Sequence, residues 1–236
     1  RGDIGVETKA DGTPVTIADR GAEEAVRRFL ERECPGHGIL GEEYPEKPGD
    51  GRYRWVLDPI DGTKSFIHHV PLWGTLIALE RDGRPVVGVI ACHAAGETIS
   101  AAEGLGAELN GRPAHVSNVT GLAAATVSTT SYARLRERAP EGFDAICAGA
   151  GLSRAWGDCY GYLMVAAGRA DVMLDPVMNH WDIAALVPVI REAGGTITGW
   201  DGEPEPSDSC VATNGHLQQA IIELLGGDLR GRGSDV

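Results

Sequence analysis

The sequence lacks three features that define large classes of proteins. It contains no run of about eighteen apolar residues, so a transmembrane helix is excluded, and no secretory leader is visible. Basic residues are scarce: 21 Lys and Arg stand against 34 Asp and Glu, and the formal net charge is −13. Nucleic acid is therefore not an expected partner, because such binding depends on Lys and Arg that neutralise phosphates.

Cysteines spaced for a disulfide framework or a zinc site are also missing. The five cysteines are scattered, odd in number and without a CxxC pair. This pattern argues against both kinds of site and fits a reducing cytoplasm, which is the expected location. A catalytic pair of Cys92 and His93 is disfavoured, because neighbouring residues on a strand point to opposite faces. We therefore interpret the cysteines as structural.

What the chain does contain is enough apolar sequence for a large core. Hydrophobic residues make up 42% of the 236 residues and charged residues 23%, which is ordinary for a globular protein. Such a chain forms one large domain or two joined lobes. The pattern of predicted strands and helices changes near residues 116–122. This change predicts an N-terminal α+β lobe (1–118) and a C-terminal α/β lobe (119–225). A flexible tail (226–236) is predicted to follow.

The hydrophobic pattern predicts mainly antiparallel strands first and alternating strands and helices later. The first helix is amphipathic and runs from Ala18 to Glu33. Strands are predicted at 38–41, 55–57, 74–80, 85–91, 97–103, 106–109, 125–129, 145–148, 170–174, 196–198 and 211–213, with hairpin turns at 81–84 and 110–111. Later helices are predicted at 132–139, 157–168, 181–193 and 216–225, and we expect Pro188 to kink the third of them.

The stretch Trp55–Phe66, which reads WVLDPIDGTKSF, organises the rest of the chain. It predicts a buried strand that Pro59 ends, because proline has no backbone donor for the ladder. Asp58 and Asp61 stand at the strand end, and a short helix begins near Thr63. Hard carboxylate oxygens suit a divalent cation, and free N–H groups at a helix start attract a phosphate. An ordinary surface turn is the alternative, because Asp-Pro and Asp-Gly are common turn dipeptides.

Three further motifs favour a functional site over a turn. Thr13–Asp19 reads TPVTIAD, Ile39–Glu43 reads ILGEE, and His180–Asp182 reads HWD. Together with Trp55–Phe66 they resemble the inositol monophosphatase family in order and approximate spacing, over essentially the whole chain. The resemblance implies an α+β fold, a layered αβαβα sandwich of the inositol monophosphatase and fructose-1,6-bisphosphatase type, and a homodimer. It also leads us to expect a helix ahead of Arg1.

The resemblance implies a Mg²⁺-dependent phosphatase with two or three ions per site. Hydrolysis of a phosphate monoester has a very high barrier, and two cations about 4 Å apart clamp the attacking and departing oxygens and activate a water. Cations also invert the local charge, which lets an acidic protein attract an anionic substrate. Zinc would favour His or Cys ligands, which are not placed for it. His68 and His69 suggest transition-metal binding, and a solvated loop is the alternative.

The implied metal ligands come from three separate segments. Glu42, Asp58 and the Ile60 carbonyl hold one ion by resemblance. Asp58, Asp61 and Asp182 hold the second ion, and a third, weaker ion shares Glu42. For Asp182, helix capping is the alternative role.

The resemblance also assigns the residues around the reacting phosphate. Glu43 and Thr63 match the positions that orient the attacking water, and Asp19 helps to order it. The backbone N–H groups of Gly62 and Thr63 receive the phosphate. Asp19 stands at the start of the predicted first helix, so a capping role or an interaction with the helix dipole is the alternative.

The expected substrate depends on Lys64 and on Ser153–Tyr162, which reads SRAWGDCYGY. Lysine at this place resembles the histidinol-phosphate and adenosine bisphosphate branches of the family, and the second segment resembles the histidinol-phosphate branch. The implied reaction is L-histidinol phosphate and water to L-histidinol and phosphate, in histidine biosynthesis. The expected substrate contacts are Asp158, Arg154 and Lys64, and an acid such as Asp158 suits the amine and imidazole of histidinol.

Alternatives stay open for these residues and for the function. Asp158 also fits a helix N-cap beside Gly157, and Arg154 fits a surface ion pair. Trp156 and Tyr160 also fit a packing role in the core. Inositol 1-phosphate and adenosine 3′,5′-bisphosphate are the alternative substrates, and a catalytically inactive regulatory homologue is the alternative outside the enzymes.

Overall fold

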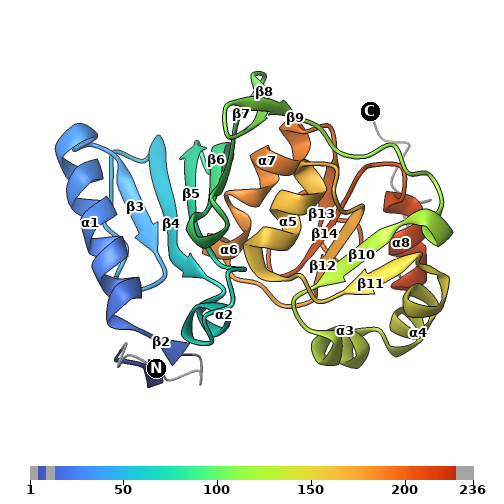
Figure 1. Ribbon diagram of the computed structural model, residues 1–236. Helices are drawn as coiled ribbons and strands as arrows, with labels where there is room; N and C mark the ends of the chain where they lie inside the picture. The colour runs from blue at the N-terminus through green and yellow to red at the C-terminus, as the bar shows by residue number, and fades with distance from the viewer. Residues whose placement is uncertain (1–4, 9–13, 227–236) are drawn as a thin grey trace.

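The computed structural model of the protein describes residues 5–8 and 14–226. They form the predicted αβαβα sandwich of an α+β protein, with helical layers outside and between two sheets (Figure 1). The three helical layers are α1 (Ile17–Glu33), then α5 (Asp158–Ala166), α6 (His180–Ile183) and α7 (Leu186–Glu192), then α3 (Tyr132–Arg138), α4 (Pro140–Gly149) and α8 (Gln218–Leu224). No described helix is long and apolar enough to cross a membrane.

The seven-stranded sheet lies between α1 and the middle helices. Its strands neighbour one another in chain order; the first two are parallel and the others antiparallel. They are β3 (Gly38–Gly41), β4 (Tyr53–Asp61), β5 (Gly74–Arg81), β6 (Arg84–Cys92), β7 (Glu97–Ala102), β8 (Gly106–Leu109) and β9 (Arg112–Ala114). Asp82-Gly83 and Asn110-Gly111 adopt positive φ at the two predicted hairpin turns, as two-residue hairpin loops require.

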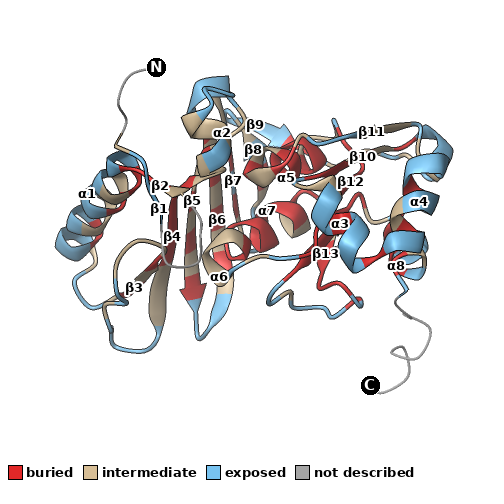
Figure 2. Cartoon of the chain, turned by 90° about the horizontal axis from the view of Figure 1, so that it is seen from below, coloured by how far each residue is buried: buried red, intermediate tan, exposed pale blue. Residues whose placement is uncertain are grey.

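The five-stranded sheet lies between the middle and outer helices, in the order β11-β10-β12-β14-β13. The strands are β10 (Thr126–Thr129), β11 (Leu152–Arg154), β12 (Val172–Asp175), β13 (Thr196–Thr198) and β14 (Cys210–Thr213). Every residue of β12 (Figure 2) and of β14 is buried, because helices cover both faces. The smaller elements are β1 (Glu7–Thr8), β2 (Pro14–Val15), α2 (Thr63–Ile67), η1 (His93–Ala95) and η2 (Leu122–Ala124).

Apolar side chains form three core clusters that join these layers. The largest places Ile90 and Ile99 of the seven-stranded sheet with helical residues such as Leu163 and Ile190. The second lies between the five-stranded sheet and the outer helices, and the third lies under α1. The predicted boundary at residue 118 falls between the last strand of one sheet and the first strand of the other. That 1–118 and 119–225 form separate lobes stays a prediction.

The prediction that Pro59 ends the central strand is wrong. β4 continues to Asp61, and its register with β5 shifts between Asp58 and Asp61. Residues 59 and 60 have no partner in that register, so proline at this irregularity removes no ladder hydrogen bond. The hydroxyl of Thr75 donates to the Pro59 carbonyl at 2.8 Å, which holds the irregular segment against β5.

Two other predictions of secondary structure are also wrong. Residues 145–148 belong to α4 rather than to a strand, because a short apolar run does not distinguish a strand from a buried helix. The strand of this region is β11, which follows α4. Residues 181–193 form two helices, α6 and α7, instead of one kinked helix. Pro188 lies in the first turn of α7, where its missing N–H is not needed.

Two predicted features lie outside the described residues. The dipeptide Asp11-Gly12 predicts a tight turn, and it falls within the undescribed residues 9–13. Of the predicted tail, 226–236, the structure describes only Gly226, whose N–H donates to the Glu223 carbonyl after α8. The tail therefore stays a prediction.

Candidate active site

A cluster of carboxylates stands where β4 ends beside α6. Asp58, Asp61 and Asp182 each place one oxygen within 4.8 Å of the other two. They line a cavity of about 370 Å³ together with Glu42, Lys64 and others. Acids that are more than a hundred residues apart in the sequence are thus brought together by folding, as predicted.

Asp58 is the most deeply buried acid of the cluster, with 1% of the residue exposed. Burial raises its pKa well above the usual range, and the charges of Asp61, Glu42 and Asp182 raise it further. Its Oδ1 atom is buried and has no hydrogen-bond partner among the described residues. An unpartnered carboxylate oxygen among like charges fits a ligand of a hard divalent cation, which would offset the repulsion.

Asp61 and Asp182 each use one carboxylate oxygen in a hydrogen bond to the backbone. Asp61 Oδ2 accepts from the N–H of Cys159 at the start of α5. Asp182 Oδ2 accepts from the N–H of Asn179 at 2.7 Å, and the two form a capping box at α6. The predicted capping alternative for Asp182 is therefore present, and Asp182 also places an oxygen in the cluster. Burial, followed by the charges of Asp158 and Asp182, raises the pKa of Asp61.

Glu42 and the Ile60 carbonyl complete the group of predicted metal ligands. Both residues line the cavity, and the Glu42 carboxyl lies close enough to Asp58 for a hydrogen bond that raises the pKa of Asp58. The Ile60 carbonyl accepts from the Thr63 hydroxyl at 3.1 Å. All five predicted ligand residues thus line one cavity, and their carboxylate and carbonyl oxygens are hard ligands of the kind that suits Mg²⁺.

Gly62 and Thr63, the predicted phosphate-binding residues, lie at the start of α2 and line the cavity; their binding of phosphate stays a prediction. Gly62 is the N-cap of α2, with a φ of 83° that favours glycine. A Cβ there would lie 3.0 Å from Asp158 Oδ2. The Thr63 hydroxyl also lies 3.4 Å from Asp19 Oδ1. Asp19 accepts from Thr16 in a capping box as well, so its capping role and its contact with Thr63 coexist.

Of four further predicted site residues, two line the cavity and two do not. Lys64 and Asp158 line it. Arg154 is not among the lining residues, and its guanidinium donates to the neighbouring Ser153 carbonyl at 2.7 Å. Glu43 is also not among them, and its backbone N–H donates to Glu23. The roles of Arg154 and Glu43 stay predictions.

Asp158 adopts a φ of 52°, which is rare for a residue other than glycine. Gly157 is the N-cap of α5 and Asp158 makes no side-chain cap, so the N-cap alternative for Asp158 is wrong. The Ser65 hydroxyl donates to Asp158 Oδ2 at 3.3 Å. Burial raises the pKa of Asp158 to about 6, against the hydrogen bond from Ser65 and the charge of Lys64. The strained backbone directs a carboxyl into the cavity.

The structure also bears on the alternative roles of two aromatic residues and two histidines. Trp156 and Tyr160 are partly buried and pack against the largest core cluster, which agrees with the packing alternative. His68 and His69 belong to no group of three potential metal ligands among the described residues. The His68 ring nitrogen Nδ1 lies 2.8 Å from the Lys64 carbonyl, and both histidines are exposed.

Asp175 and Arg134 also line the cavity, although neither was among the residues predicted from the sequence. Asp175 ends the buried strand β12 and accepts hydrogen bonds of 3.1 Å from the Thr130 N–H and the Tyr162 hydroxyl. Burial raises its pKa to about 7. An acid directly after an apolar strand is the signal that pointed to Asp58, and it was available here too. Arg134 lies on the exposed helix α3 and carried no such signal.

Comparison with known proteins identifies the family. Residues 2–228 match the inositol monophosphatase family, and the chain belongs to it. The histidinol-phosphatase of Chlorobaculum parvum is 42% identical over 235 residues, which cover 98% of this chain and 91% of that protein. The histidinol-phosphatase of Mycobacterium tuberculosis is 43% identical over 94% of this chain and 88% of its own. Among solved structures, the extragenic suppressor protein suhB of Bartonella henselae superposes with a TM-score of 0.88 at 30% identity, over 94% of this chain and 90% of that one.

Proposed function

We propose that the protein is a Mg²⁺-dependent phosphate monoester hydrolase that converts L-histidinol phosphate and water to L-histidinol and phosphate. The observation that carries the proposal is the acid cluster with its buried, unpartnered Asp58 oxygen. Identity of 42–43% to two histidinol-phosphatases over nearly the full length supports the substrate. The cytoplasm and a homodimer are part of the proposal.

In this proposal, the acids hold the metal ions. Glu42, Asp58 and the Ile60 carbonyl hold one Mg²⁺, and Asp58, Asp61 and Asp182 hold the second. A third, weaker ion shares Glu42. When bound, the ions stabilise the charge that develops on the phosphate and make a water more acidic.

The remaining residues of the site place the reactants. The hydroxyl of Thr63 and the carboxylate of Glu43 orient the attacking water, and Asp19 supports Thr63 through their 3.4 Å contact. The N–H groups of Gly62 and Thr63 receive the phosphate at the start of α2, where the backbone is free to donate. These groups are held by the fold before substrate arrives, which reduces the cost of ordering in the reaction.

The acidic wall of the cavity supports a cationic substrate. Asp158 and Asp175 add two carboxyl groups to a cavity that already holds the metal-binding acids. Such groups suit the amine and the imidazole of histidinol, whereas a polyol such as inositol would be matched by neutral donors and acceptors. Lys64 faces the same cavity and contributes a positive charge for the phosphate, and Arg154 is proposed to contact the substrate.

The test is a measurement of phosphate release from three substrates, with Mg²⁺ and after treatment with EDTA. We expect Mg²⁺-dependent release that is fastest from L-histidinol phosphate. Turnover of inositol 1-phosphate or adenosine 3′,5′-bisphosphate at an equal or higher rate would refute the substrate assignment. Absence of Mg²⁺-dependent release from all three would favour an inactive regulatory homologue.

A further inference from the structure

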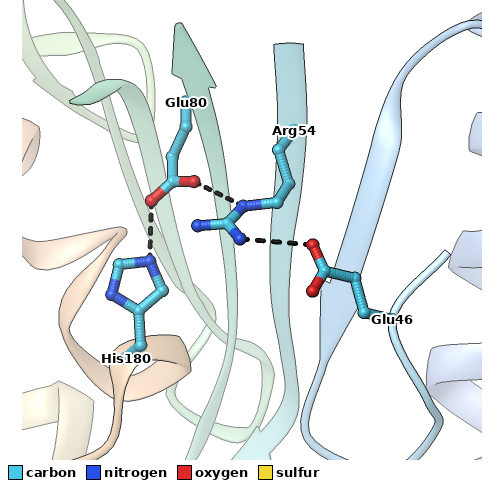
Figure 3. A network of polar contacts seen from close by, with 4 residues as sticks. All are labelled: Glu46, Arg54, Glu80 and His180. Atoms are coloured by element: carbon cyan, nitrogen blue, oxygen red, sulfur yellow. Dashed lines mark hydrogen bonds and ion pairs between the residues drawn. The ribbon is translucent and has the colours of Figure 1, made fainter. Parts of the chain in front are cut away.

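A chain of polar contacts connects the seven-stranded sheet to α6 (Figure 3). Arg54 Nε on β4 donates to Glu80 Oε2 on β5 at 2.7 Å, and another guanidinium nitrogen lies 3.2 Å from Glu46 Oε1. His180 Nε2, at the start of α6, lies 2.6 Å from Glu80 Oε1. We call Arg54, Glu80 and His180 the Glu80 bridge.

Glu80 is a charged group that is buried in the protein, with 1% of its side chain exposed. Burial by itself raises its pKa, but the hydrogen bonds from His180 and Arg54 outweigh that effect and lower the pKa overall. Glu80 is therefore a carboxylate at neutral pH, and both of its oxygens accept. A buried carboxylate that loses a partner is costly, so the contact with His180 resists breaking.

The helix that His180 begins is too short to hold its own position. α6 has four residues, His180–Ile183, and one turn of helix is not stable without tertiary contacts. It carries Asp182, the one acid of the cluster that does not come from β4. Glu80 lies on β5, the strand that pairs with β4 along its length. The Glu80 bridge thus connects α6, which contains Asp182, to the sheet that contains Asp58 and Asp61.

We propose that Glu80 and His180 are positioning residues for metal binding: their hydrogen bond holds α6 on the sheet and sets Asp182 relative to Asp58 and Asp61. Neither residue lines the cavity, so they act through Asp182. The inference rests on the proposed Mg²⁺ dependence. Mg²⁺ tolerates little deviation from its preferred ligand geometry, so a small shift of α6 weakens binding.

The experiment measures Mg²⁺ binding to the metal-free protein by titration calorimetry, without substrate. His180→Ala removes the contact, and because 40% of the His180 side chain is exposed, we expect the variant to fold. We expect its Mg²⁺ affinity to fall about tenfold, the size typical for partners of metal ligands. His180→Gln, which keeps an amide N–H that can reach Glu80, should recover most of the affinity. His216→Ala changes an exposed histidine beside α8 and should bind Mg²⁺ as the parent does.

A second readout separates positioning from a general loss of structure. With saturating Mg²⁺, the kcat of His180→Ala should return to within about twofold of the parent, because only the metal equilibrium has changed. Thermal unfolding of the metal-free variant should remain one cooperative transition, at a temperature that is lower by several degrees because the buried Glu80 loses a partner. A further variant, Glu80→Gln, keeps the shape but loses the charge that strengthens the hydrogen bond, and it should weaken Mg²⁺ binding in the same direction.

The outcomes distinguish the inference from the function on which it rests. If the parent protein binds no Mg²⁺, the proposed function fails. If the parent binds Mg²⁺ and His180→Ala binds it equally well, the function stands and the positioning role is overturned. The same conclusion follows if Glu80→Gln weakens binding and His180→Ala does not, because Glu80 would then act through Arg54 alone.

Discussion

The carboxylate of Glu23, on α1, accepts a hydrogen bond of 2.8 Å from the backbone N–H of Glu43. Its other oxygen accepts from Arg27 Nε at 2.7 Å, and Arg27 also donates to the Tyr44 carbonyl at 3.1 Å. A Cβ on Gly41 would lie 2.1 Å from Glu23 Oε1, so glycine is required for this close approach. The first helix thus holds the segment that presents Glu42 and Glu43.

Replacement of Glu23 tests this connection. Glu23→Ala leaves Arg27 and the Glu43 N–H without their buried partner, and we expect a loss of about 3 kcal/mol in the free energy of unfolding. The matched control is Glu24→Ala, which removes an exposed pair with Arg28 on the same helix and should cost less than about 1 kcal/mol. Urea unfolding followed by circular dichroism measures both. Equal effects of the two variants would contradict a structural role for Glu23.

Replacement of Asp61 separates metal binding from stability. Asp61→Asn removes one negative charge from the acid cluster, so the metal-free variant should unfold at the same or a higher temperature than the parent. Its Mg²⁺ affinity and its phosphate release should fall by more than about a hundredfold, beyond the loss of an outer partner. Thermal unfolding with and without Mg²⁺, together with a phosphate assay, tests both. Unchanged activity in the variant would refute the metal assignment.

The pKa of Asp175 predicts how stability changes with pH in the metal-free protein. Because burial raises this pKa to about 7, the folded state holds a proton that the unfolded state releases near pH 4. The contribution of Asp175 to stability is therefore complete below about pH 4 and is lost as the pH rises through about 7. Asp175→Asn keeps the shape and removes the titration.

Thermal unfolding between about pH 5 and 8, a range that encloses the folded-state pKa of Asp175, measures this prediction. Relative to the parent, Asp175→Asn should become more stable as the pH rises. Glu97→Gln, which weakens the exposed ion pair of Glu97 with Arg169, is the control and should leave the pH dependence above pH 5 nearly unchanged, because the pKa of Glu97 is lowered. A constant difference between parent and Asp175→Asn across the range would show that Asp175 does not titrate there.

We expect Asp158 to favour L-histidinol phosphate over inositol 1-phosphate as a substrate. Asp158→Asn keeps a side chain that tolerates a positive φ and removes the negative charge offered to a cationic substrate. We expect kcat/KM for L-histidinol phosphate to fall about tenfold or more, with little change for inositol 1-phosphate. The ratio of the two kcat/KM values is the measurement. A parallel fall for both substrates would assign Asp158 to catalysis or structure instead of recognition.

The local pattern was sufficient for most elements of the fold. Alternating apolar residues and Asp-Gly predict the hairpin of β5 and β6, and the spacing of apolar residues predicts α1. The local pattern gave wrong predictions where tertiary packing determines the secondary structure. Residues 145–148 are helical because α4 packs against α8 and η2, and β4 continues through Pro59 because the shifted register with β5 needs no donor there.

The short motifs alone identify the residues that we propose to supply the chemistry. Each of the four acids stands in a short, contiguous sequence motif, and such a motif can be recognised without the structure. The four acids are Glu42, Asp58, Asp61 and Asp182. The groups that stand around them are recognisable only in the folded protein: Asp175 on the cavity wall, Glu23 behind Glu43, and Glu80 beside His180. These partners are 13 to 100 residues apart in sequence, at Tyr162–Asp175 and Glu80–His180 respectively, and their contacts depend on how the layers pack. No local pattern encodes such a contact, because it exists only after the sheets and helices have come together.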